Sequence, residues 1–137
     1  MSQRISKQIG EIALRVRDMT VMRDFYRDVI GLEPIREAET FVFFRIADGF
    51  AGHTQVLALF DRSSQTGYVP PDGQQTTVDH FAFSISKADF DSEDKRLQNL
   101  GCDLTYAYHD WVKWRSLYVV DPEGNTVELV CYDEVAK

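Results

Sequence analysis

The sequence contains two similar halves, and this internal repeat constrains the fold more than any other feature of the 137 residues. Glu11–Val16 (EIALRV) matches His80–Ile85 (HFAFSI) at an offset of 69 residues, and Leu57–Phe60 matches Val127–Val130 at an offset of 70. The drift of one residue across a half corresponds to a single change in loop length. Repeats of this length are supersecondary units that pack against their copies. The sequence therefore predicts two tandem copies of one unit.

Both halves show the same order of secondary-structure signals. Residues 12–16 alternate between apolar and other side chains, as a strand with one buried face does. Residues 18–30 carry apolar side chains at helical spacing, and Gly31 follows where a helix ends. The expected elements are strands 12–16, 33–35, 41–46 and 54–60 with helix 18–30 in the first half, and strands 78–85, 102–106, 112–120 and 125–132 with helix 88–100 in the second. This order predicts an α+β fold of two βαβββ modules in one domain over residues 1–137, with module one at about 9–62, a linker at about 63–77 and module two at about 78–133.

Composition and charge exclude several classes of protein. The longest apolar run, Val56–Phe60, is far shorter than the roughly 20 residues of a membrane helix, and the first ten residues lack the apolar core of a signal peptide. The net charge of −7 argues against nucleic acid as a partner, because that binding depends on Lys and Arg. Cys102 and Cys131 form no CxxC pair and are expected to stay reduced. We expect a soluble cytoplasmic protein with a small-molecule partner.

The repeat brings metal-binding residue types to matched positions. Glu11 matches His80, and Ala58 matches Glu128, so three of the four matched positions carry a carboxylate or an imidazole. One imidazole and two carboxylates make an open metal site with free positions for water or substrate. The alternatives are ordinary ones, in which His80 is a hydrogen-bonded core residue and the two glutamates face solvent.

Three segments carry a resemblance to a known superfamily. They are Phe25–Leu32 (FYRDVIGL), Val78–Phe83 (VDHFAF) and Leu117–Leu129 (LYVVDPEGNTVEL). Together they resemble the vicinal oxygen chelate superfamily over about residues 9–133. That superfamily includes glyoxalase I, fosfomycin-resistance transferases, extradiol dioxygenases, methylmalonyl-CoA epimerase and bleomycin-resistance proteins. The resemblance implies two modules that form a U-shaped mixed sheet around a divalent metal ion.

The resemblance also implies where the metal ligands lie. Carried over by position, they are Glu11, His80 and Glu128, while Ala58 stands where glyoxalase I has a glutamate. This departure argues against glyoxalase I activity itself but is compatible with the transferase and dioxygenase arrangements. One imidazole with two carboxylates differs from the two-His, one-carboxylate set of non-haem iron oxygenases and suits a Lewis acid such as Mn, Zn, Ni or Mg, with Fe(II) as a further alternative. The implied chemistry is chelation of neighbouring substrate oxygens for a lyase, isomerase or dioxygenase reaction, with Glu11 or Glu128 as the catalytic carboxylate that moves a proton.

The segment 106–115 (YAYHDWVKWR) is dense in aromatic side chains. The residues expected to bind substrate are Tyr106, Tyr108, His109, Trp111, Trp114 and Arg115. The alternative is ordinary sheet packing with solvated charges. At the level of function, the alternative to an enzyme is a metal-free ligand-sequestering protein like the bleomycin-resistance proteins. Both interpretations expect a homodimer, because members of the superfamily commonly pair modules across a subunit interface.

Overall fold

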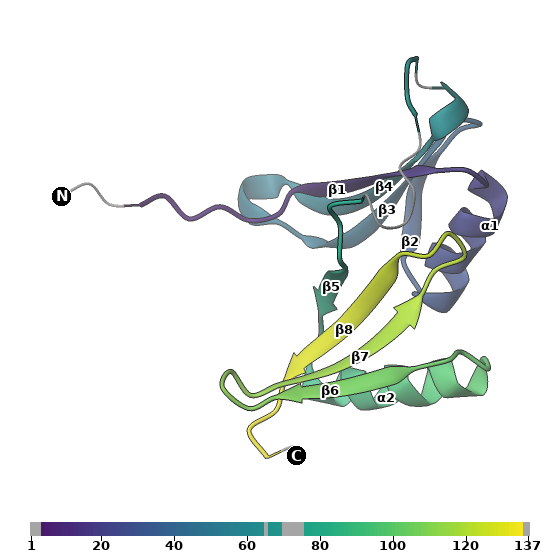
Figure 1. The fold of residues 1–137 in the computed structure, drawn as a ribbon. Helices are drawn as coiled ribbons and strands as arrows, with labels where there is room; N and C mark the ends of the chain where they lie inside the picture. Colours follow the sequence, from purple (N-terminus) through teal and green to yellow (C-terminus); the bar gives the residue numbers. More distant parts are fainter. Residues whose placement is uncertain (1–3, 65, 70–75, 136–137) are drawn as a thin grey trace. The chain divides into compact units, whose positions relative to one another are not determined.

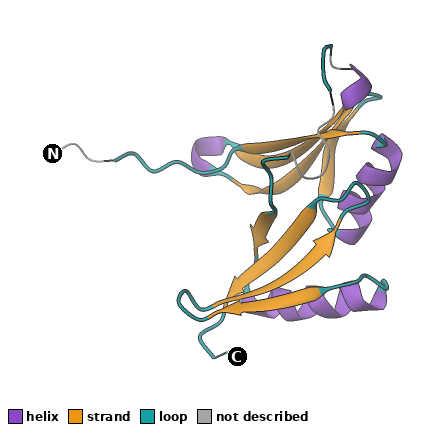
Figure 2. Ribbon diagram, viewed as in Figure 1, coloured by secondary structure: helices purple, strands orange, loops and turns teal. Residues whose placement is uncertain are grey.

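The computed structural model describes residues 4–64, 66–69 and 76–135, in two compact units that span Met1–Val69 and Pro70–Lys137. Each unit contains one four-stranded sheet with a helix against it (Figures 1 and 2). Among the described residues, none of the helices has the length and apolar character needed to cross a membrane.

The two units have the same order of elements and the same sheet topology. The first unit contains β1 (Glu11–Val16), α1 (Met19–Asp24), a π-helical turn (Phe25–Val29), β2 (Glu33–Glu37), β3 (Phe41–Asp48) and β4 (Thr54–Asp61), with 3-10 turns at Phe50–Gly52 and Arg62–Ser64. The second contains β5 (Phe81–Ser84), α2 (Lys87–Asn99), β6 (Thr105–His109), β7 (Trp114–Val120) and β8 (Thr126–Tyr132). The strand orders are β1-β4-β3-β2 and β5-β8-β7-β6, with the first pair parallel in each sheet. The predicted α+β fold of two tandem modules is therefore confirmed.

The strand register reproduces the repeat residue by residue. Ala13 in β1 lies opposite Ala58 in β4, and Ala82 in β5 lies opposite Glu128 in β8. These two pairs are related by the same offsets that the sequence shows. The match of Ala58 with Glu128 is thus a match of structural positions as well as of letters.

Each unit has its own core on the face of the sheet that its helix covers. In the first unit Met22 and Tyr26, one turn apart, are fully buried together with residues of β3 and β4. In the second unit Phe90 and Leu97 of α2 are fully buried. Burial of each such side chain contributes about 1.5–3 kcal/mol to stability. The helices therefore cover one face of each sheet.

Three elements differ most from the sequence prediction, and the bounds of the others agree with it to within two residues. The first helix changes from α to π after Asp24, where Ile30 N–H donates to the Phe25 carbonyl at 3.0 Å. The strand expected at 102–106 is instead Thr105–His109, because the Cys102 N–H still bonds back to Leu97 and closes the helix. The strand expected at 78–85 is shorter, at Phe81–Ser84. The linker expected at 63–77 lies partly outside the described residues, namely at 65 and 70–75.

Candidate functional site

The structure brings two of the predicted metal ligands together within the second unit. His80 directly precedes β5, and Glu128 lies in the neighbouring strand β8. Because Glu128 is opposite Ala82 and side chains alternate along a strand, His80 and Glu128 share one face of the sheet. The His80 Nε2 atom lies 3.0 Å from Glu128 Oε1. Glu128 is only 6% exposed, whereas the His80 side chain is 40% exposed.

Further polar contacts orient both side chains. Asp79 Oδ1 lies 2.6 Å from His80 Nδ1, an arrangement that directs the other ring nitrogen, Nε2, toward Glu128. The hydrogen bond with Asp79, reinforced by the negative charge of Glu128, raises the pKa of His80. On β7, the Ser116 hydroxyl donates to Glu128 Oε2 at 2.6 Å. The Tyr118 ring stands edge-on to the His80 ring, with centroids 6.1 Å apart.

The geometry of this pair fits a divalent metal ion. Two ligand atoms at about 2.1 Å from an octahedral ion, at a right angle to each other, are about 3.0 Å apart. His80 Nε2 and Glu128 Oε1 have this separation, which is also that of a direct hydrogen bond between the two side chains. Within the described residues, however, no group of three or more His, Cys, Asp or Glu side chains is arranged to hold a metal ion. The second unit thus supplies two adjacent donor atoms, His80 Nε2 and Glu128 Oε1.

The other two repeat-matched positions belong to the first unit. Glu11 is exposed at the start of β1, and Ala58 is fully buried in β4 and offers no donor atom.

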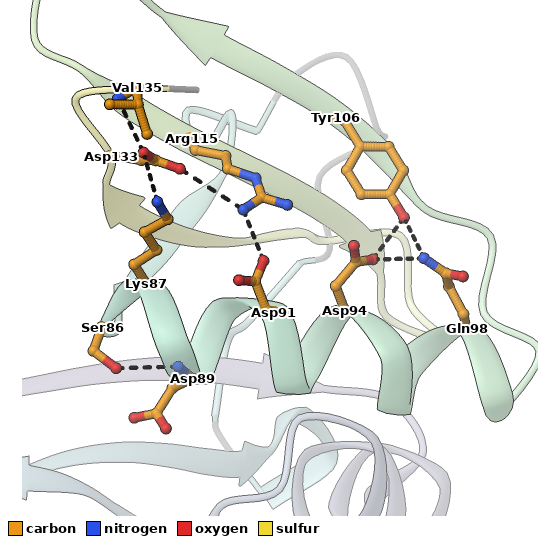
Figure 3. Close-up of polar contacts among 10 residues, drawn as sticks. All are labelled: Ser86, Lys87, Asp89, Asp91, Asp94, Gln98, Tyr106, Arg115, Asp133 and Val135. Atoms are coloured by element: carbon orange, nitrogen blue, oxygen red, sulfur yellow. Dashed lines mark hydrogen bonds and ion pairs between the residues drawn. The ribbon is translucent and has the colours of Figure 1, made fainter. Parts of the chain in front are cut away.

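Tyr106 and Arg115, predicted to bind substrate, point to the face of the sheet that α2 covers (Figure 3). The Tyr106 hydroxyl donates to Asp94 of α2 at 2.7 Å, and this hydrogen bond raises the pKa of the phenol. Arg115 donates to Asp91 of α2 at 2.8 Å, and its guanidinium lies 4.5 Å from the centre of the Phe90 ring. Their side chains stabilise the packing of the helix, and this placement argues against direct contact with a ligand at His80.

The remaining predicted substrate residues divide between the two faces and the hairpin turn. Tyr108 lies opposite Arg115 and donates to the Asp133 carbonyl at 2.9 Å. His109 and Trp114 are paired across β6 and β7 on the His80 face, because they alternate with Tyr108 and Arg115. Trp111, in the turn between these strands, is 84% exposed, and its ring lies 6.5 Å from that of Trp114. His109, Trp111 and Trp114 therefore stay candidates for ligand contact.

Sequence reasoning missed Ser116 and Tyr118 as members of the site. The signal that identifies them is the hairpin between β7 and β8, whose turn contains Asp121 and Gly124. Counting back from this turn pairs Tyr118 with Glu128 and places Ser116 two residues further along the same face. Without this register, nothing in the sequence distinguishes Ser116 from any other serine in a strand.

Comparison with known proteins decides the family. The model of the Glyoxalase/Bleomycin resistance protein/Dioxygenase superfamily matches residues 8–129. The chain belongs to this superfamily. Glutathione transferase FosA from Serratia marcescens is 26% identical over 123 residues, which cover 90% of this chain and 79% of FosA.

Solved structures of the superfamily fold agree with this assignment. Lactoylglutathione lyase from Agrobacterium tumefaciens is 29% identical, with a TM-score of 0.67 over 93% of this chain and 96% of the lyase. The fosfomycin resistance protein FosX from Listeria monocytogenes is 21% identical, with a TM-score of 0.62 over 93% of this chain and 94% of FosX. The second likeness shows the fold alone.

Proposed function

We propose that the chain is a metal-dependent enzyme of this superfamily. In this proposal Glu11, His80 and Glu128 hold a divalent ion (Mn, Zn, Ni, Mg or Fe(II)), and the substrate is a small metabolite with neighbouring oxygen atoms. The reaction is of the lyase, isomerase or dioxygenase type. The observation that carries the proposal is the 3.0 Å separation of His80 Nε2 and Glu128 Oε1, which suits adjacent ligands of one ion.

The exposure and hydrogen bonds of each residue indicate its role in this proposal. A bound divalent ion supplies Lewis-acid stabilisation of negative charge on substrate oxygens. Asp79 orients His80 so that its Nε2 is the ligand atom. Of the two glutamates, Glu11 is exposed and Glu128 is buried. We therefore assign proton transfer first to Glu11, whose carboxylate is accessible to a substrate, with Glu128 as the second candidate.

Metal content tests this proposal directly. The untagged protein, purified without chelator, is analysed by plasma mass spectrometry beside Glu128→Ala, His80→Ala and the exposed control Glu134→Ala. We expect close to one ion per chain in the parent and in Glu134→Ala, and little in the two site variants. Absence of metal from the parent, also after incubation with Mn, Ni, Zn and Fe(II), overturns the proposal.

The names of the relatives suggest the first substrates to test. Both the transferase and the lyase carry glutathione in their names, and FosX is a fosfomycin resistance protein. The screen therefore includes S-lactoylglutathione and fosfomycin with glutathione, each with metal-loaded parent and Glu128→Ala. Turnover by the parent alone identifies the reaction class.

Trp111 and Trp114 favour a second candidate function, a metal-free protein that sequesters a ligand. Their exposed rings on one hairpin suit a planar ligand. Calorimetric titration with bleomycin in the presence of EDTA tests this candidate, with Trp111→Ala as the comparison. Binding by the parent that weakens in Trp111→Ala supports it, and absence of heat at micromolar protein rejects it for this ligand.

The proposed assembly is a homodimer, as expected for the superfamily. Sedimentation velocity tests it, and a monomer at micromolar concentration would contradict it.

A further inference from the structure

We propose that Ser116 is a positioning residue for Glu128, holding the buried carboxylate so that Oε1 is presented to the metal ion. This inference rests on the proposed function, because it concerns the same ligand. It adds a residue from β7 that makes no contact with the ion itself.

The hydrogen bond from Ser116 is short and uses the full donor capacity of the side chain. Ser116 is fully buried, and its Oγ lies 2.6 Å from Glu128 Oε2. This distance is typical of a hydroxyl that donates to an ionised carboxylate. A serine hydroxyl has one proton to donate, so this bond commits it. The two oxygens of Glu128 are thereby distinguished, with Oε2 directed to Ser116 and Oε1 to His80.

A serine buried at this position lowers stability unless its hydroxyl has a hydrogen-bond partner, and Glu128 is that partner. Strand interiors favour β-branched and aromatic side chains, and a buried hydroxyl without a partner is costly. The neighbours of Ser116 on the same face of β7 are the aromatic residues Trp114 and Tyr118. The hydrogen bond to Glu128 offsets the cost of burying this hydroxyl.

The first unit provides an internal comparison. There Phe43 lies opposite Ala58 as Tyr118 lies opposite Glu128, so the position that matches Ser116 is Phe41. The first unit thus lacks both the carboxylate and the hydroxyl, and the second unit has both. The serine accompanies the glutamate in one copy of the repeat, as expected if the two side chains act together.

Removal of the hydroxyl should weaken metal binding. The last torsion of a glutamate side chain is broad, so a carboxylate without Ser116 samples several orientations. Loss of a partner that orients a metal ligand typically lowers metal affinity by 10- to 100-fold. We expect a Kd increase of about this size for Mn²⁺ in Ser116→Ala.

The experiment is a titration of metal-free protein with Mn²⁺, in which the electron paramagnetic resonance signal of the free ion gives the Kd. The matched control is Ser84→Ala, which removes an exposed hydroxyl from β5 on the same sheet face. Melting of each metal-free variant in EDTA confirms folding. We expect a 10- to 100-fold higher Kd for Ser116→Ala and an unchanged Kd for Ser84→Ala.

The outcomes separate this inference from the proposed function. A Kd for Ser116→Ala within about twofold of the parent overturns the inference alone, and a lower melting temperature with that unchanged Kd assigns Ser116 a structural role only. If the parent binds none of Mn²⁺, Ni²⁺, Zn²⁺ and Fe(II), the proposed function fails and the inference fails with it. If Ser116→Ala does not fold, Ser116→Cys replaces it, because the thiol preserves volume and is a weak donor. The same criterion on Kd then decides.

Discussion

At the scale of single residues, Glu128 is the side chain whose burial is hardest to justify by stability. A carboxylate that is 6% exposed loses hydration, and its partners Ser116 and His80 replace that hydration only in part. Replacement of a buried ion pair by packed apolar residues is frequently neutral or stabilising. Residues that serve a reaction often lower stability in this way.

This cost leads to a prediction for the metal-free protein. The double variant Glu128→Leu, Ser116→Ala should raise the free energy of unfolding by about 1–3 kcal/mol, because it removes a buried carboxylate together with its donor. Glu128→Leu alone should gain less, since it leaves the Ser116 hydroxyl without its acceptor. Urea denaturation in EDTA measures both. A double variant less stable than the parent would show that the pair stabilises the fold.

The two cysteines should differ sharply in reactivity. Both are free thiols; Cys131 is buried in β8, and desolvation raises the pKa of its thiol. A raised pKa leaves less thiolate at pH 8, so Cys131 reacts slowly and its rate increases as the pH rises. Cys102 is partly exposed. We expect iodoacetamide to label one thiol of the native protein within minutes, and Cys102→Ser to abolish this fast labelling in mass spectra. Rapid labelling of Cys131 would contradict its burial.

The sequence singled out His80 and Glu128, which the structure brings into contact, but not the side chain of β7 that contacts Glu128. His80 and Glu128 stand out because the repeat matches them with Glu11 and Ala58. Ser116 has no such signal, because its role depends on side-chain direction across two strands. The expected substrate residues Tyr106 and Arg115 were assigned from composition, and strand alternation directs them to α2 instead.

At the scale of elements, α2 and the segment after β8 are joined by a buried carboxylate. Asp133 is 4% exposed and lies 3.3 Å from Lys87 Nζ and 3.8 Å from Arg115 Nη1 (Figure 3). Arg115 in turn bonds to Asp91 of α2. These contacts connect the end of the second sheet to the first turn of its helix.

Loss of the Asp133 charge should therefore weaken the second unit. We expect Asp133→Asn to lower the free energy of unfolding by about 1–3 kcal/mol, a value below that of a fully buried pair because both cations are partly exposed. Urea denaturation measures the change, and Glu134→Gln, at an exposed neighbouring position, should stay within about 0.5 kcal/mol of the parent. Equal stability of Asp133→Asn and the parent would show that the ion pairs of Asp133 with Lys87 and Arg115 do not stabilise the fold.

The order of elements was predictable from the sequence, while several boundaries were not. Hydrophobic spacing predicts a helix at 88–100, which the structure has at Lys87–Asn99, and Ser86 caps it by accepting the Asp89 N–H. The shift of β6 to Thr105–His109 depends on where the hairpin turn at 110–113 closes, with Lys113 at φ 59°. A lysine with positive φ is uncommon, so the sequence around residues 110–113 does not indicate where the turn lies.

At the scale of the whole molecule, the two units share one fold but differ in the polarity of matched positions. The second unit has Glu128 with Ser116, and the first has Ala58 with Phe41. Phe41 belongs to a cluster of phenylalanine rings with Phe43 and Phe60. The same backbone register thus carries a polar pair in one copy and an aromatic cluster in the other.

This difference predicts how the first unit tolerates a carboxylate. Ala58 is fully buried, so Ala58→Glu should lower the free energy of unfolding by about 3–5 kcal/mol, as expected for a buried charge without a partner. Phe41→Ser removes a ring from the phenylalanine cluster, but it should cost less stability in the Ala58→Glu background than alone, because there it supplies the matched hydroxyl. A double-mutant cycle by urea denaturation gives the coupling energy. If the stability changes of Ala58→Glu and Phe41→Ser are strictly additive, the two side chains do not interact in the first unit as Glu128 and Ser116 do in the second.

The exposed hairpin also determines what can be observed in solution. Trp111 and Trp114 are the two tryptophans of the chain, and both belong to the turn and strand that follow β6. Intrinsic indole emission therefore originates entirely from the second unit. An unfolding curve recorded by that emission would miss a transition confined to the first unit, which only a probe distributed over both sheets, such as far-ultraviolet circular dichroism, would register.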